Sequence, residues 1–342
     1  MRLAAVGLLA LLAGCGPSLA GVVAFHPADG PPAPGDRRVE MRYLGSGGWL
    51  IRRGADAIAT APFVSNPINA EIYLGPARPD TARIERLVPA MPDVRMILVG
   101  HTHYDHAMDL PEVLRRKAPN ARLYGGATLE HLFKKTLGEG RVVNMVRAPA
   151  AGEPAGPRWF AEPGVRVRAM ALPSSHAPHV LGVLKVVSSA RLDRDLEPSE
   201  LPAVPAAWPE GDTVAFLIDF LEDDGRTVAF RIYYQDAAAH PGKGEIPPLP
   251  AGEQAPVDVA ILCVAGFDQV KDNPRRILGN VKPQQVVGGH WEDFFSRSPD
   301  LPWRVARGTD LSKFVREVHR AAPVPVYVPE PGRALSFPLG AR

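Results

Sequence analysis

The pattern of hydrophobic and polar positions predicts folded structure from about residue 39 onward. Residues 39–44 alternate between apolar and polar side chains, which is typical of a half-buried strand. Residues 49–51 and 57–60 flank Arg52-Arg53-Gly54 and suggest a hairpin. A largely apolar strand is expected at residues 94–99, further strands at 122–124, 142–147, 165–172, 214–220, 228–234, 257–264 and 285–287, and helices at 81–87, 110–117, 128–137, 274–278 and 311–319.

This order of elements predicts the fold class. The early strands form a β-rich section and the later strands alternate with helices, which favours a mixed α/β sandwich over residues 39–342. One segment interrupts the rhythm, because residues 188–211 are rich in proline and carry no strand or helix pattern. Long loops of this kind in compact domains are commonly lids or binding loops.

Residues 1–15 resemble a bacterial lipoprotein signal peptide. Arg2 supplies a positive charge, residues 3–13 form a short apolar run, and the run ends in Leu12-Ala13-Gly14-Cys15, which resembles a lipobox. We expect the Cys15 thiol to be acylated, and an ordinary signal peptide cleaved after Ala20 is the alternative. Several acyl chains on one cysteine would anchor the protein firmly, since each buried CH₂ contributes about 0.8 kcal/mol.

Residues 16–38 are predicted to form a tether between this anchor and the folded domain, because they are rich in proline and glycine. Gly16, rather than an aspartate, follows the cysteine, so the inner-membrane retention signal of such lipoproteins is missing. We therefore expect an exported outer-membrane lipoprotein that faces the periplasm.

Composition narrows the choice of partners. Of the 342 residues, 46% are hydrophobic and 22% are charged, which is ordinary for a globular protein. The net charge is +2 and no dense Lys/Arg tract occurs, so charge indicates neither nucleic acid nor an anionic membrane surface as a partner. The second cysteine, Cys263, lies in an apolar run and is expected to be a buried strand thiol without a disulfide.

The strongest chemical signal is a cluster of four metal-ligating side chains directly after the strand at residues 94–99. His101, His103, Asp105 and His106 lie within one hexapeptide. Imidazole nitrogens and carboxylate oxygens are the ligands expected for zinc or iron. Four such groups could not be buried without partners, since their desolvation would cost several kcal/mol. The cluster therefore predicts a metal site at the end of a strand.

The spacing His-X-His-X-Asp-His after an apolar strand resembles the signature of the metallo-β-lactamase superfamily. That resemblance implies an αββα sandwich, with two mixed β-sheets flanked by helices, and further ligands at later strand ends. His176, Asp236 and His290 follow predicted strands in the expected order. The resemblance implies that one metal is held by His101, His103 and His176, that a second is held by Asp105, His106 and His290, and that Asp236 bridges the two.

The same resemblance implies the chemistry. Two Zn²⁺ ions, with iron or manganese as alternatives, would hold a bridging hydroxide as the nucleophile, because zinc lowers the pKa of bound water to about 7. Asp105 and Asp236 would then be catalytic as well as ligands. His179 is a candidate for contact with the substrate or proton donation to the leaving group, and a surface role is the alternative. Candidates for lining the substrate pocket are Tyr104, Trp291 and Asp293.

The opening segment Gly45-Ser-Gly-Gly-Trp-Leu-Ile51, with residues 59–63, resembles one branch of the superfamily. That branch contains ascorbate-6-phosphate lactonase and the N-acylphosphatidylethanolamine phospholipases D. In the branch an Asp-Pro pair usually follows the threonine, whereas this chain has Ala61-Pro62.

We therefore expect a zinc-dependent hydrolase that cleaves a phosphodiester, ester or lactone bond in a small-molecule or lipid substrate, attached to the membrane through its N-terminal anchor. A β-lactamase or an iron-dependent sulfur dioxygenase is one alternative. A non-catalytic metal-binding lipoprotein is another, although it would have no need of seven ligand positions.

Overall fold

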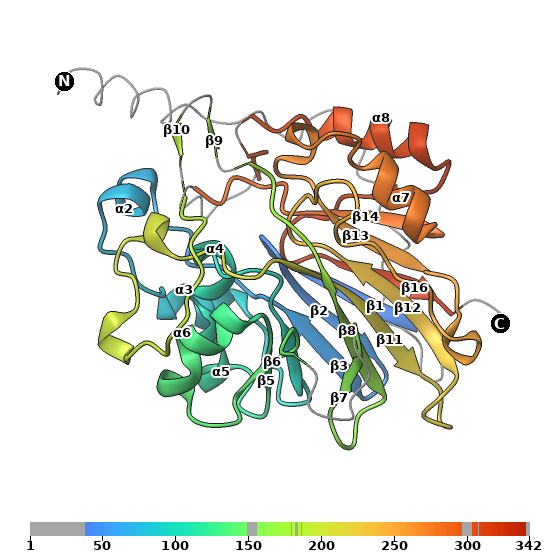
Figure 1. Ribbon diagram of the computed structural model, residues 1–342, viewed down its shortest axis with the longest axis horizontal. Helices are drawn as coiled ribbons and strands as arrows, with labels where there is room; N and C mark the ends of the chain where they lie inside the picture. Colours follow the sequence, from blue (N-terminus) through green and yellow to red (C-terminus); the bar gives the residue numbers. More distant parts are fainter. Residues whose placement is uncertain are drawn as a thin grey trace.

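The computed structural model of the protein describes residues 38–148, 156–178, 180–181, 184–185, 187–295, 303–306 and 308–339. The predicted signal peptide at 1–15 with Cys15, the tether up to residue 37, and His179 lie outside the described residues. Figure 1 shows the described chain as two layers of strands with helices on either side. No helix within the described ranges is long and apolar enough to cross a membrane.

The first sheet has seven strands, in the order β16-β1-β2-β3-β4-β5-β6. Neighbours from β16 to β3 are antiparallel, and those from β3 to β6 are parallel. Their bounds are β1 Arg38–Gly45, β2 Gly48–Arg53, β3 Asp56–Thr60, β4 Met96–Leu98, β5 Arg122–Gly125, β6 Val142–Asn144 and β16 Ala334–Pro338.

The second sheet repeats this plan with seven strands in the order β15-β14-β13-β12-β11-β8-β7. Neighbours from β7 to β12 are antiparallel, and those from β12 to β15 are parallel. The bounds are β7 Trp159–Ala161, β8 Val167–Pro173, β11 Val214–Leu221, β12 Val228–Tyr234, β13 Val259–Cys263, β14 Gln285–Gly289 and β15 Val326–Tyr327, and a separate hairpin joins β9 Val180–Leu181 to β10 Leu184–Lys185.

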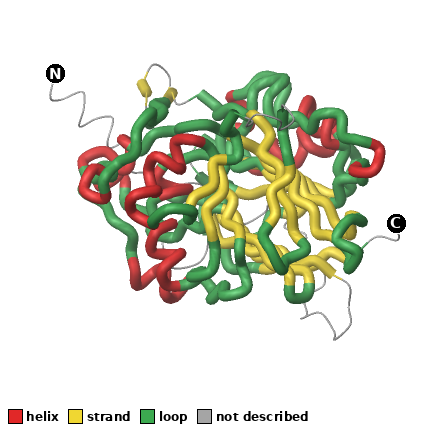
Figure 2. Tube along the Cα trace, turned by 60° about the horizontal axis from the view of Figure 1, so that its bottom comes forward, coloured by secondary structure: helices red, strands yellow, loops and turns green. Residues whose placement is uncertain are grey.

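Helices cover the outer faces of both sheets, as Figure 2 shows with helices in red and strands in yellow. Near the first sheet lie α2 Asn69–Leu74, α3 Thr81–Leu87, α4 Tyr104–Ala107, α5 Leu110–Arg116 and α6 Ala127–Leu137, and on the second sheet lie α7 Arg275–Val281 and α8 Leu311–Ala321. Two of them begin at aspartate caps, since Asp80 accepts from the Arg83 amide and Asp310 from the Lys313 amide.

Alternation along the strands divides the apolar residues into two cores. Met96 and Leu98 of β4 face the second sheet, whereas Ile97 faces the helices of the first sheet. The inner core therefore lies between the sheets and continues to α7 and α8, and the outer core lies under α3, α5 and α6. This is how two sheets and two helical layers bury their apolar faces together. The predicted αββα sandwich is confirmed.

Several short elements have no clear pattern in the sequence. Among them are α2, α4 and the edge strands β7, β15 and β16, which pair mainly because a neighbouring strand is already in place. The strand expected at 94–99 is shorter than predicted, because the chain leaves the sheet after Leu98 to reach the metal-binding cluster. The Pro-rich segment 188–211 holds only the 3₁₀ turns η1 Pro198–Glu200 and η2 Pro205–Ala207, in agreement with the expected loop.

Candidate metal centre

The predicted metal ligands meet at one edge of the sandwich. His101 follows β4, His176 follows β8, Asp236 follows β12 and His290 follows β14 directly. Strands β8, β12 and β14 run in the same direction, so their carboxyl ends lie at the same edge of the second sheet. Side chains that come from four separate strand ends therefore gather at one point.

Three side chains form the second half of the site. The Asp105 Oδ2 atom lies 3.1 Å from His290 Nε2 and 3.5 Å from His106 Nε2. The two Nε2 atoms are 3.2 Å apart. Donor atoms about 2.0–2.1 Å from a tetrahedral zinc ion are about 3.3 Å from one another. The spacing of these three atoms fits a bound cation of that size.

His101, His103 and His176 form the first half, with their candidate ligand atoms within 4.8 Å of one another. Main-chain carbonyls fix two of the rings. The Ser188 carbonyl accepts from His103 Nε2 at 2.9 Å, and the Ala177 carbonyl accepts from His176 Nδ1 at 2.8 Å. A ring nitrogen that donates to a carbonyl leaves the other nitrogen unprotonated and available to a metal.

Asp236 lies between the two halves. One carboxylate oxygen is 3.2 Å from His101 Nδ1, and the other is 3.4 Å from His106 Nδ1. The Gly100 amide donates to this second oxygen at 3.1 Å. A Cβ atom at Gly100 would lie only 2.2 Å from the carboxylate, so the approach of Asp236 requires a glycine there.

The donor set suits a cation electrostatically. Asp105 and Asp236 are buried, and within the described part of the chain their ion-pair partners are histidines. Burial and the neighbouring histidines hold the pKa of His106 well below its usual value, which keeps its imidazole neutral. At His101 burial lowers the pKa, but the Asp236 carboxylate more than offsets this effect, and the pKa is raised. Imidazole nitrogens with two carboxylates are a donor set for zinc or iron.

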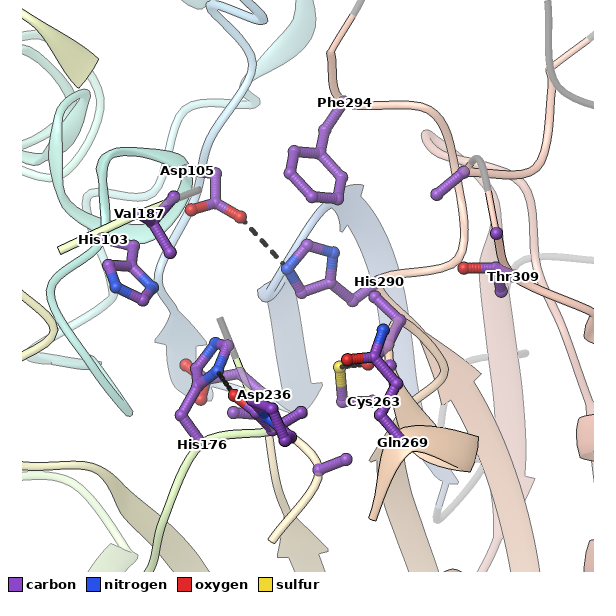
Figure 3. Close-up of a pocket in the computed structure, with 18 of the residues that line it drawn as sticks. His103, Asp105, His176, Val187, Asp236, Cys263, Gln269, His290, Phe294 and Thr309 are labelled. Atoms are coloured by element: carbon purple, nitrogen blue, oxygen red, sulfur yellow. Dashed lines mark hydrogen bonds and ion pairs between the residues drawn. The ribbon is translucent and has the colours of Figure 1, made fainter. Parts of the chain in front are cut away.

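A cavity of about 190 Å³ opens onto these ligands. Figure 3 shows Asp105 facing His290 across it, with Phe294 beside the histidine. The rings of His290 and Phe294 have centroids 4.6 Å apart. Besides ligand residues, the cavity wall includes polar Tyr104, Gln269 and Thr309 and apolar Val187, Phe294 and Phe295.

Solved structures share this architecture. A metallo hydrolase called Igni18, from the hyperthermophilic archaeon Ignicoccus hospitalis KIN4/I, matches with a TM-score of 0.50 and 17% identity over 89% of this chain and 100% of that chain. The metallo-beta-lactamase fold protein YhfI from Bacillus subtilis matches with a TM-score of 0.48 and 12% identity over 87% of this chain and 99% of that chain. A possible metal-dependent hydrolase from Veillonella parvula DSM 2008 matches with a TM-score of 0.46 and 11% identity, again over 87% and 99%. The chain has the metallo-β-lactamase fold. The sequence matches no family model and no curated protein.

Within this metallo-β-lactamase fold, the three predicted pocket residues take different places. Tyr104 lines the cavity. Trp291 is fully buried in the core, and its indole N–H donates to the Pro329 carbonyl at 2.9 Å, so it packs rather than lines the cavity. Asp293 is not among the described lining residues, and its carboxylate accepts from the Phe295 amide at 3.1 Å.

Several residues that line the cavity were not expected from the sequence, among them Phe294 and Cys263. Phe294 lines the cavity four positions after His290. Cys263 ends β13 and also lines the cavity, and its position at a strand end is the signal that could have revealed it. Burial raises the pKa of the Cys263 thiol well above its usual value, and the thiol donates to the Ala265 carbonyl at 3.4 Å. It is therefore a neutral thiol, as a buried strand cysteine should be.

Asp109, close to the ligand cluster in the sequence, supplies a fully buried carboxylate. It accepts from the amides of Val64 and Ser65 at 2.8 and 3.0 Å, and from the Ser65 hydroxyl at 2.6 Å. Burial raises the pKa of Asp109 to about 6. These bonds tie the segment after β3 to the helix that follows the ligand cluster. The sequence interpretation missed this residue, although it comes only three positions after His106.

Proposed function

We propose that this chain is a hydrolase with two bound metal ions, zinc being the first choice and iron or manganese the alternatives. One observation carries the proposal: the Asp236 carboxylate lies between His101 and His106, at 3.2 and 3.4 Å, and so joins two separate groups of ligands. His101, His103 and His176 would hold one ion, Asp105, His106 and His290 the other, and Asp236 both.

Two such ions, when bound, would supply a nucleophile from water at neutral pH and would polarise the bond that breaks. The protein chain contributes by fixing the positions of the ligand side chains and by shaping the cavity above them. The imidazole of His106 stays neutral because it is buried among other histidines. Tyr104 also lines the cavity, and burial raises the pKa of its phenol well above the usual value, so the phenol stays protonated.

The side chains of the cavity wall favour one class of substrate. Phe294 and Phe295 lie at the cavity wall with ring centroids 4.2 Å apart and ring planes tilted by 33°, and these two aromatic side chains suit an apolar substituent. None of the lining residues that the structure describes is lysine or arginine, whereas a doubly charged phosphate ester would favour such a partner. We therefore propose a phosphodiester, ester or lactone with an apolar group.

The resemblance of residues 45–51 to the lactonase and phospholipase D branch agrees with this substrate class. An outer-membrane lipoprotein, anchored through Cys15 and facing the periplasm, would meet lipid substrates there. His179 stays a predicted proton donor, since it follows the ligand His176 by three positions.

Measurement of bound metal together with activity tests the proposal. Purified full-length protein is expected to hold two metal equivalents and to cleave one of three substrates, a bis-aryl phosphodiester, an aryl ester or an acyl lactone. Asp236→Ala is expected to lose one equivalent and more than 100-fold in kcat. Retention of full activity by this variant would overturn the two-metal proposal. Cleavage of a β-lactam alone, oxidation of a persulfide with bound iron, or metal binding without turnover would each support an alternative instead.

Variation of the substrate tests the apolar wall separately. Phe294→Ala is expected to raise KM about tenfold for substrates with a long acyl or aryl group and to leave KM for short-chain substrates nearly unchanged. An equal change for both kinds of substrate would contradict the assignment of this wall.

A further inference from the structure

The turn between β1 and β2 lies against His106. Gly47 in this turn has no room for a side chain, because a Cβ atom there would lie 2.6 Å from His106 Nδ1 and 2.8 Å from the Tyr234 hydroxyl. The Gly47 carbonyl accepts from that hydroxyl at 2.7 Å and from the Thr60 hydroxyl at 2.5 Å. Two side chains from other strands therefore hold the turn against the ligand.

The same turn also reaches His290, through a buried pair formed by Tyr43 and Glu292. The Ser46 amide donates to one oxygen of Glu292, and the Tyr43 hydroxyl donates to the other. The Tyr43 oxygen in turn accepts from the main-chain N–H of His290 at 2.8 Å. Tyr43 is fully buried, and Glu292 is 2% exposed.

The main chain of His290 needs such support. Its φ of 54° lies in the left-handed region, which residues with a Cβ atom adopt only when the surroundings hold them there. This conformation directs the ring so that Nε2 lies 3.1 Å from Asp105 and 3.2 Å from His106. The Tyr43 hydroxyl oxygen accepts its hydrogen bond from the amide of this same residue.

We propose that Tyr43 and Glu292 are positioning residues that set the spacing of His106 and His290. Glu292 orients the phenol and ties it to the turn, the phenol holds the left-handed main chain of His290, and the turn limits the position of His106. The proposal rests on the two-metal site of the proposed function. It predicts that binding of the second metal depends on a pair of residues that do not touch the metal.

Metal titration of full-length variants tests this dependence. Metal-free protein would be titrated with Co²⁺, whose visible absorption reports its coordination, and with Zn²⁺ followed by elemental analysis. Tyr43→Phe and Glu292→Ala are expected to bind the first equivalent as the wild type does and the second 10- to 100-fold more weakly. Glu292→Gln keeps one oxygen acceptor and is expected to recover part of the loss. If Tyr43→Phe and Glu292→Ala bind both metal equivalents with wild-type affinity, the proposal is overturned.

The chain offers a matched control, because the Tyr124 hydroxyl on β5 donates to Glu162 in a second tyrosine–glutamate pair. Tyr124→Phe and Glu162→Gln are expected to leave both metal affinities unchanged. An equal weakening in these variants would show a general loss of stability and would also overturn the proposal. The titration needs no substrate, so absence of a detectable activity would count against the proposed reaction and not against this assignment.

Amide hydrogen exchange of the metal-free protein supplies a second readout. Loss of the Tyr43 hydroxyl removes the acceptor of the His290 N–H, so Tyr43→Phe is expected to speed exchange in a peptide spanning residues 288–292 at least tenfold. Exchange at the wild-type rate in that peptide would contradict a positioning role for Tyr43.

Discussion

The Nε2 atoms of His106 and His290 face each other at 3.2 Å, although the two residues are 184 positions apart in the sequence. Both rings are buried, and the Asp105 carboxylate lies against both nitrogens. Two unprotonated imidazole nitrogens at this distance repel each other unless a cation or a proton lies between them. A bound metal ion would remove this repulsion and would also neutralise the buried carboxylates.

Removal of metal is therefore expected to destabilise the protein. A ligand that binds only the folded state at about a thousand times its Kd adds about 4 kcal/mol of stability, so a strong chelator should lower Tm by several degrees. Calorimetry with and without chelator, followed by readdition of Zn²⁺, measures the change. His101→Ala is the control, since its Tm should respond much less to chelation. Superimposable melting curves for the wild-type protein would contradict metal binding at this site.

Gly100→Ala is expected to disrupt the site while the fold is kept. The new Cβ atom would lie 2.2 Å from the Asp236 carboxylate, which must then move away from His101 and His106. We expect loss of at least one metal equivalent and more than a 100-fold loss in kcat, measured by elemental analysis and steady-state kinetics. Gly279→Ala in α7 is the matched control, because open space surrounds that position and alanine favours a helix. Normal metal content in Gly100→Ala would refute the close packing described above.

Asp219→Asn is expected to destabilise the second sheet far from the metal ligands. The Asp219 carboxylate accepts two hydrogen bonds from Arg231, at 2.6 and 2.8 Å, and two from Arg168, at 2.9 and 3.0 Å, and it is fully buried. Removal of one partner from a buried ion pair typically costs about 3–5 kcal/mol. Urea unfolding measures this cost.

The more exposed Glu112, which accepts from both Arg115 and Arg116, provides the comparison for Asp219, since Glu112→Gln should cost less than about 1 kcal/mol. If Asp219→Asn and Glu112→Gln lose similar amounts of unfolding free energy, the burial of Asp219 does not strengthen its contribution to stability.

Asp109 is expected to give the stability of the protein a specific pH dependence. Burial raises the pKa of Asp109 from 3.8 to about 6 in the folded protein, so the folded state binds the proton more tightly than the unfolded chain does. The resulting stability is present below about pH 4 and is lost as the pH rises through about 6, and it amounts to about 3 kcal/mol. Between pH 4 and pH 7, the free energy of unfolding of Asp109→Asn should therefore increase by about 3 kcal/mol relative to that of the wild type. A constant difference between the two proteins across that range would disprove the prediction.

The sequence alone determined the class of fold and indicated the candidate metal ligands. Alternating and amphipathic segments located the long strands and helices, because side chains on one face of an element share one environment. The cluster from His101 to His106 stood out since four ligating side chains, three histidines and one aspartate, in one hexapeptide after a strand have no structural reason to be there. His176, Asp236 and His290 were expected from the resemblance to the metallo-β-lactamase superfamily, which implies further ligands at later strand ends, and each of them follows a predicted strand.

Only the tertiary structure decided how these groups face one another and what surrounds them. Trp291 and Phe294 are close neighbours in the sequence, yet one is packed in the core and the other lines the cavity. The pairing of Tyr43 with Glu292 joins residues 249 positions apart. Such contacts depend on the register of strands in two sheets and on single turns, such as the left-handed one at His290, and local sequence patterns carry no information about distances across the sandwich.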